Sequence, residues 1–171
     1  MKGLVTLSSA LVLVSSMASA HITLEAGEAV AGSTYKAVLR VPHGCAGSPT
    51  VKLRVRMPEG VSNVKPQPKP GWDLTVTKGK LIEPATGEHG GQVSEGVREI
   101  MWSGGSLPDD FYDEFVFIAG LPTTPGVTLY FPVVQDCENG SVRWIEVPAA
   151  GQSAHDLKEP APRLHLNPKP Q

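Results

Sequence analysis

The feature that most constrains the fold is a series of short runs in which apolar and polar residues alternate. In the clearest run, residues 50–57, apolar and basic side chains fall on opposite faces: Val51, Leu53, Val55 and Met57 against Lys52, Arg54 and Arg56. Successive side chains of a strand point to opposite faces, so this pattern predicts a half-buried strand. The chain's 18 glycines and 16 prolines separate such runs, and no segment keeps a helical period over about eleven residues.

Seven further runs of the same kind predict strands at residues 21–25, 33–41, 72–76, 97–102, 111–118, 127–134 and 141–147. About eight short strands with turn signals between them indicate an all-β fold, an antiparallel β-sandwich. Asn139-Gly140 predicts a hairpin turn between the last two of these strands. Pro132 lies inside a strand-like run, so that strand is expected to be an edge strand or to carry a bulge.

Two segments lack such alternation. Residues 86–96 are polar and rich in glycine, and we expect a mobile loop there. Residues 149–171 are polar and rich in proline, which predicts a tail with little structure of its own. The predicted folded domain is therefore residues 21–148.

The first twenty residues predict a secretory signal peptide. Lys2 precedes an apolar stretch that ends in Ala18-Ser19-Ala20, an A-x-A cleavage pattern. Cleavage after Ala20 would make His21 the first residue of a mature protein in the periplasm. No other segment is long and apolar enough to span a membrane, so we expect no membrane anchor.

Charge argues against two kinds of partner. Without Lys2, 14 basic residues face 17 acidic ones, a net charge of −3 with histidine neutral. A nucleic-acid-binding protein would need a basic stripe, which is absent from the sequence. There is also no basic amphipathic helix that would suggest binding to a membrane surface.

The two cysteines, Cys45 and Cys137, allow two interpretations. Oxidising conditions outside the cytoplasm favour a disulfide, and closing a loop of about 90 residues would stabilise the fold by roughly 4–5 kcal/mol. Two thiolates could instead hold copper(I). We expect the disulfide because of the compartment.

His21 is the most informative residue for function. After cleavage, its α-amine and its imidazole Nδ1 could chelate one metal ion in a six-membered ring. Nitrogen donors completed by oxygen suit tetragonal copper(II). The amine has a pKa near 8, so a metal can displace its proton at neutral pH. The alternative is a histidine left at this position by chance.

Two further residues attract attention but have ordinary explanations. Glu114 shares a strand face with Tyr112, Val116 and Ile118, and a carboxylate among such neighbours needs a partner, which a metal would supply. The pattern alone favours a solvent-facing acid beside a basic residue. Trp144 could cover a metal site, although an ordinary core tryptophan fits its strand position as well.

Sequence motifs of several enzyme classes are missing. There is no C-x-x-C, H-E-x-x-H, phosphate loop or G-x-S-x-G elbow. Beyond the signal peptide the only methionines are Met57 and Met101, too few for a methionine-rich copper(I) shuttle. Cys137 lacks the nearby histidine and methionine of a blue-copper site. The sequence therefore predicts a binding protein and not an enzyme.

Several motifs follow one another in a specific order: His21-Ile22-Thr23, Val41-Pro42-His43-Gly44-Cys45, Gln67-Pro68 with Pro70-Gly71-Trp72, Trp102-Ser103-Gly104-Gly105, Asp113-Glu114-Phe115 with Phe117, Phe131-Pro132, Gln135 with Cys137, and Gly140 through Trp144. In this order the sequence resembles the YcnI-like family of exported bacterial domains. The resemblance runs from His21 to about Pro148.

The resemblance implies a β-sandwich related to cupredoxin-like and immunoglobulin-like folds. It also implies copper(II) held by a single-histidine brace, in which His21 gives its amine and imidazole, Glu114 supplies oxygen, and Trp144 packs beside the ion. Asp113 and Glu25 are alternative oxygen ligands.

Three functions remain open from the sequence. The first is a periplasmic copper carrier in copper homeostasis, which would exchange copper(II) with another copper chaperone or an importer. The second is a copper enzyme like the polysaccharide monooxygenases, which needs a second histidine, either His43 or His89, at the site. The third is a structural sandwich module without metal.

Overall fold

The computed structural model describes residues 21–87 and 90–170. The predicted signal peptide, residues 1–20, and His89 lie outside the described residues. In the described part of the chain, no helix has the length and apolarity that crossing a membrane requires.

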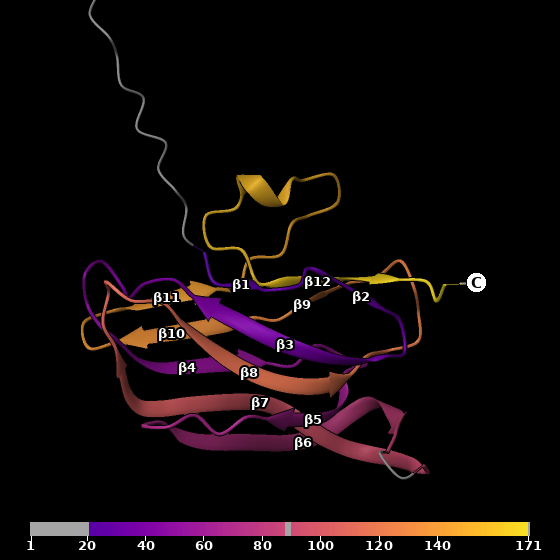
Figure 1. Ribbon diagram of the computed structural model, residues 1–171. Coiled ribbons are helices and arrows are strands. Elements are labelled where there is room, and N and C mark those ends of the chain that lie inside the picture. The colour runs from indigo at the N-terminus through magenta and orange to yellow at the C-terminus, as the bar shows by residue number, and fades with distance from the viewer. Residues whose placement is uncertain (1–20, 88–89, 171) are drawn as a thin grey trace, which may run out of the picture.

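Two antiparallel sheets form the body of the protein (Figure 1). The first sheet has the order β1 (Thr23–Leu24), β3 (Thr34–Val41), β8 (Asp113–Gly120) and β5 (Ser62–Pro66). The second has the order β11 (Ser141–Trp144), β10 (Val133–Cys137), β4 (Thr50–Arg56), β7 (Gln92–Leu107) and β6 (Asp73–Thr86). A third, smaller sheet joins β2 (Glu28–Val30), β12 (Arg163–Asn167) and β9 (Thr128–Tyr130), with β2 and β12 parallel.

The alternating residues turn their apolar side chains into the space between the sheets. In β3, Ala37, Leu39 and Val41 are buried, whereas Lys36 and Arg40 are exposed. The two large sheets meet through aromatic side chains: the ring centroids of Trp102 on β7 and Phe115 on β8 lie 5.5 Å apart, and both residues are fully buried. The predicted antiparallel β-sandwich is therefore confirmed.

The predicted hairpin at Asn139-Gly140 is also confirmed, because β10 and β11 pair on either side of it. Gly140 has φ +91°, a value that favours glycine. The strand expected over residues 127–134 divides at Pro132 into β9 and β10, which belong to different sheets. Proline has no N–H to donate and so ends the pairing at this point.

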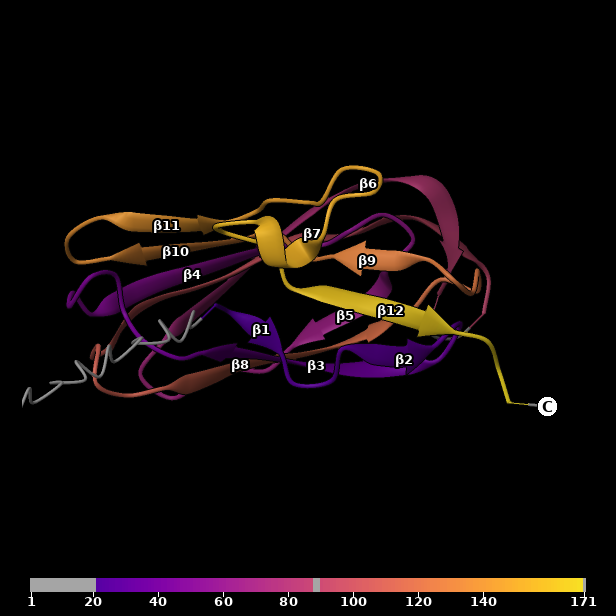
Figure 2. The same cartoon turned by 90° about the horizontal axis from the view of Figure 1, so that it is seen from above.

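The prediction of a tail with little structure is wrong for its last part. Strand β12 pairs with β2 on one side and β9 on the other, and Leu164 and Leu166 are completely buried. The domain therefore extends beyond the predicted boundary at Pro148. The segment between β11 and β12 forms a loop that contains the short 3-10 helix η1 (Ala154–Asp156) and rises above β1 and β12 (Figures 1 and 2).

The glycine-rich loop is shorter than predicted. Strands β6 and β7 extend into residues 86–96, and the pairing reaches Thr86 opposite Gln92. Strand β5 was not anticipated, because Ser-Asn-Val-Lys-Pro neither alternates in polarity nor excludes proline. Its pairing with β8 nevertheless holds Val64 in the core.

Candidate functional site

The structure brings His21 and Trp144 together, in agreement with what the family resemblance implies. His21 precedes β1, the edge strand of the first sheet, and Trp144 ends β11, the edge strand of the second. Their ring centroids are 5.4 Å apart with an interplanar angle of 67°, an edge-on contact. His21 is half-buried, and only 6% of Trp144 is exposed. The indole thus covers one side of the histidine.

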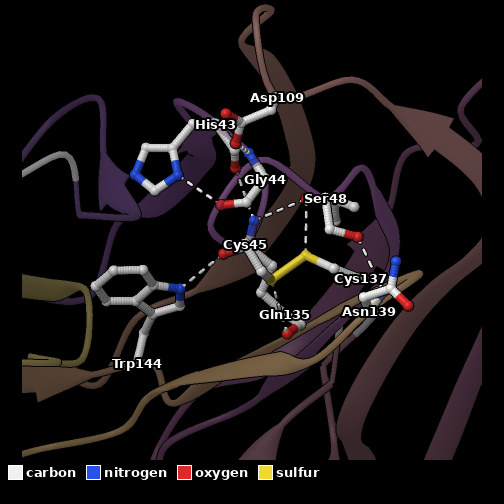
Figure 3. Close-up of a disulfide and its surroundings, with 10 residues drawn as sticks. His43, Gly44, Cys45, Ser48, Asp109, Gln135, Cys137, Asn139 and Trp144 are labelled. Atoms are coloured by element: carbon white, nitrogen blue, oxygen red, sulfur yellow. Dashed lines mark hydrogen bonds between the residues drawn. A yellow bond between two sulfur atoms is a disulfide. The ribbon is translucent and has the colours of Figure 1, made fainter.

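A buried glutamine fixes the position of the indole. Trp144 Nε1 donates a hydrogen bond of 3.0 Å to Oε1 of Gln135 on β10. The amide nitrogen of Gln135 donates in turn to the carbonyl of His43 at 2.8 Å and to Thr50 Oγ1 at 2.7 Å (Figure 3). The 1% exposed amide is therefore fully engaged, and it joins Trp144 to the turn that carries His43.

From sequence alone, Gln135 stands out only as part of a family motif. A signal was present: Gln135 occupies an inward-facing position between Val133 and Cys137 in an alternating strand. A polar residue in such a position must find hydrogen-bond partners inside the protein.

The turn after β3 is held by hydrogen bonds and by close packing at Gly44. Gly44 N donates to Asp109 Oδ1 at 2.9 Å, and a side chain at Gly44 would collide with the carbonyl of Ser48. Cys45 and Ser48 exchange backbone hydrogen bonds of 2.9 and 3.0 Å. The His43 ring donates from Nδ1 to the carbonyl of Gly44 at 2.6 Å. Figure 3 shows the His43 ring and the Trp144 indole on the same side of the disulfide.

Cys45 and Cys137 form a disulfide between this turn and β10, with Cα atoms 6.0 Å apart. The prediction of a disulfide is confirmed. The alternative copper(I) site made of two thiolates is thereby removed, because both sulfur atoms are bonded to each other.

The three carboxylates considered as oxygen ligands each lie beside a cation. Asp113 pairs with Lys69 at 2.6 Å, and Glu25 pairs with Arg40 at 2.7 Å. Glu114 on β8 lies opposite Arg40 on β3, and 3.8 Å separate Glu114 Oε1 from Arg40 Nε. That distance is too long for a hydrogen bond, so Glu114 is the least tightly held of the three. Its role as a metal ligand stays a prediction.

A groove of about 280 Å³ opens beside His21. One wall is β1, and the other is the loop between β11 and β12, which contributes Glu146, His155 and Leu157. The loop is fastened at its base, because Glu146 Oε2 accepts from Glu159 N at 2.6 Å and Ala161 N donates to the carbonyl of Glu146 at 2.9 Å. His155, assigned to an unstructured tail from sequence, thus lies near the predicted site.

Among the described residues, no three histidine, cysteine or acidic side chains gather as a metal site. A brace at a mature N-terminus needs fewer side chains, since the main-chain amine and one imidazole provide two donors. An imidazole packed against a buried indole at the edge of the sandwich fits that donor set, because the indole excludes water from one side.

The fold is an immunoglobulin-like β-sandwich, with two antiparallel sheets packed face to face. The family described as "Domain of unknown function (DUF1775)" matches residues 21–166, and the chain belongs to this family. This confirms, at the level of the domain, the resemblance to the YcnI-like family, whose domain it is. The match extends into β12 as far as Leu166, in agreement with the corrected domain boundary.

One solved structure is similar over most of the chain. It is described as "Crystal structure of an uncharacterized protein from Nocardia farcinica reveals an immunoglobulin-like fold". The two share 29% sequence identity with a TM-score of 0.64, over 87% of this chain and 99% of the other. No curated protein matches this chain.

Proposed function

We propose that this protein is a periplasmic carrier that binds copper(II) through His21 at its mature N-terminus. The observation that carries the proposal is the edge-on contact between His21 and the buried indole of Trp144. The contact orients the one imidazole that cleavage after Ala20 would place beside a free amine.

The chemistry of these two nitrogens suits copper(II). The amine loses its proton to a metal at neutral pH, and the imidazole binds through Nδ1 in the same chelate ring. Copper(II) prefers nitrogen and oxygen donors in a tetragonal arrangement. Because His21 is half-buried, the ion would be shielded on the Trp144 side and open to solvent or a partner on the other.

Glu114 is the proposed oxygen ligand. Its side chain is 39% exposed and its ion pair with Arg40 is long. Exposed ion pairs contribute about 0–1 kcal/mol, so a metal can displace the arginine at little cost. Asp113 and Glu25 would each have to give up a shorter ion pair.

Export follows from the predicted signal peptide and gives the site its amine. In the periplasm, the carrier would exchange copper(II) with another copper chaperone or with an importer. N-terminal sequencing of the exported protein should read His-Ile-Thr from its first residue. An intact Met1 would leave the amine of His21 in a peptide bond and contradict the proposal.

The central experiment is a copper(II) titration of the protein that begins at His21, followed by electron paramagnetic resonance. We expect one tight equivalent with a nitrogen-rich tetragonal spectrum. The matched control carries one glycine ahead of His21, which places the His21 nitrogen in a peptide bond and leaves all side chains in place. Equal affinity with the same spectrum in both proteins would overturn the proposal.

The same samples separate a carrier from the other two functions. A carrier should release copper to a chelator and, with a reductant, should leave chitin and cellulose uncut. Oxidised oligosaccharides would assign it to the monooxygenase-like enzymes. A metal-free structural module would bind no stoichiometric copper.

A further inference from the structure

We propose that His43 provides a third nitrogen ligand, Nε2, to the copper(II) ion bound at His21. The inference rests on the proposed copper site. It replaces a brace of one histidine by a site that uses the imidazoles of His21 and His43 together with the α-amine.

Strand register brings the backbone at His21 close to the turn that carries His43. Strands β1 and β3 are antiparallel, with Thr23 opposite Arg40 and Leu24 opposite Leu39. Carried two residues further, the same register brings His21 level with Pro42, immediately before His43. The burial of Ile22 and Val41, at 1% and 0%, is consistent with this continuation.

The same indole connects the two histidines. His21 packs edge-on against Trp144, whose Nε1 is bonded to Gln135, and Gln135 holds the carbonyl of His43. A single buried side chain on β10 therefore fixes the distance between the Trp144 indole and the His43 backbone. Figure 3 shows the His43 ring and the Trp144 indole on the same side of the disulfide.

The hydrogen bond of the His43 ring sets its tautomer. The carbonyl of Gly44 can only accept, so Nδ1 must carry the hydrogen across the 2.6 Å contact. The lone pair of the neutral ring then lies on Nε2. Histidines that bind metals almost always donate their other ring nitrogen to a carboxylate or a backbone carbonyl, and His43 has that arrangement.

His43 is also preorganised. Its carbonyl is bound by Gln135, the next residue is held by Asp109, and the residue after that is cross-linked to β10. A metal ligand held in place before binding loses little conformational freedom when the ion arrives. The turn therefore has the rigidity that a metal site requires.

The test compares His43→Ala and His155→Ala in the protein that begins at His21. His155 is the matched control, because it is an exposed imidazole that lines the groove beside His21. Loss of a ligand should weaken copper(II) binding by at least about 10- to 100-fold, the loss typical even of residues that only support a metal ligand. We expect that loss in His43→Ala and an unchanged affinity in His155→Ala.

Pulsed electron paramagnetic resonance of the unmodified protein provides a readout that does not depend on folding of a variant. Electron spin-echo envelope modulation counts coordinated imidazoles, and we expect two. One imidazole, with His43→Ala binding normally and the glycine-extended protein not binding, would overturn the role of His43 and leave the brace intact. Loss of tight binding in His155→Ala alone would assign the second imidazole to the loop and also overturn the proposal.

Discussion

Two grooves in the described part of the chain differ in both size and chemistry. The larger, about 650 Å³, lies where β3 begins and β8 ends, and its described lining is mainly glycine, serine, threonine and proline, with Lys65 as the charged residue. The smaller, about 280 Å³, contains His21, Glu146 and His155. Volume alone would select the larger groove as the binding site. The titratable groups, the indole and the buried hydrogen bonds all favour the smaller one.

The supports of the two regions differ as well. Beside His21, a glutamine that is 1% exposed, a disulfide and a constrained turn hold the side chains in place. At the other groove, the β6–β7 hairpin carries Ile82 with 78% exposure. Side chains beside His21 are therefore held by buried hydrogen bonds and a disulfide, whereas Ile82 projects into solvent.

Truncating the chain before the loop that walls the smaller groove should have the largest effect on stability. Truncation after Pro148 deletes β12 and with it Leu164 and Leu166, both 0% exposed. Removing the side chain of one such leucine costs about 2–5 kcal/mol, against a total stability of about 5–15 kcal/mol. We expect the truncated protein to lose cooperative thermal unfolding, whereas truncation after Asn167 should keep it. A folded 21–148 fragment would restore the boundary predicted from sequence.

Breaking the disulfide should have the next largest effect. The bond joins residues 92 apart in sequence. Replacing both Cys45 and Cys137 by serine should reduce the free energy of unfolding by about 4–5 kcal/mol, because the unfolded chain is no longer constrained. Denaturant titration measures this difference, and reductant added to the unmodified protein is the control. Equal midpoints would show that the bond does not constrain the unfolded state.

A substitution on the β6–β7 hairpin, at the larger groove, should have the smallest effect on stability. Ile82→Ser alters an exposed side chain on β6, and its stability should stay within about 0.5 kcal/mol of the original. Copper(II) affinity should not change. A weaker affinity in this variant would mean that the two regions are energetically coupled.

The sequence predicted the sandwich because alternation is a local signal. Alternate side chains of each strand face the core, so β3, β4 and β8 could be recognised from their own residues. Strand β12 could not: Arg-Leu-His-Leu-Asn is short, follows a proline-rich loop, and becomes buried only by pairing with distant β2 and β9. Its burial is a tertiary property.

The candidate site, like the fold, was predictable only where a local sequence signal exists. His21 was identified by its position after the cleavage pattern, and its contact with Trp144 agrees with the resemblance. The links through Gln135 were not predictable, because they join residues up to 92 positions apart. The structure also explains why two motifs distant in sequence occur together. A side chain at Gly105 would collide with the Trp72 indole, so a tryptophan at position 72 requires a glycine at position 105.

The parallel pairing of β12 with β2 has a consequence for the order of assembly. His165 pairs with Glu28, so the end of the chain completes a sheet begun near residue 28. Contacts so distant in sequence form late and slow the search for the native topology. A chain still emerging from the ribosome lacks β12, the strand that joins β2 to β9. The third sheet can therefore close only after residues 163–167 have left the ribosome.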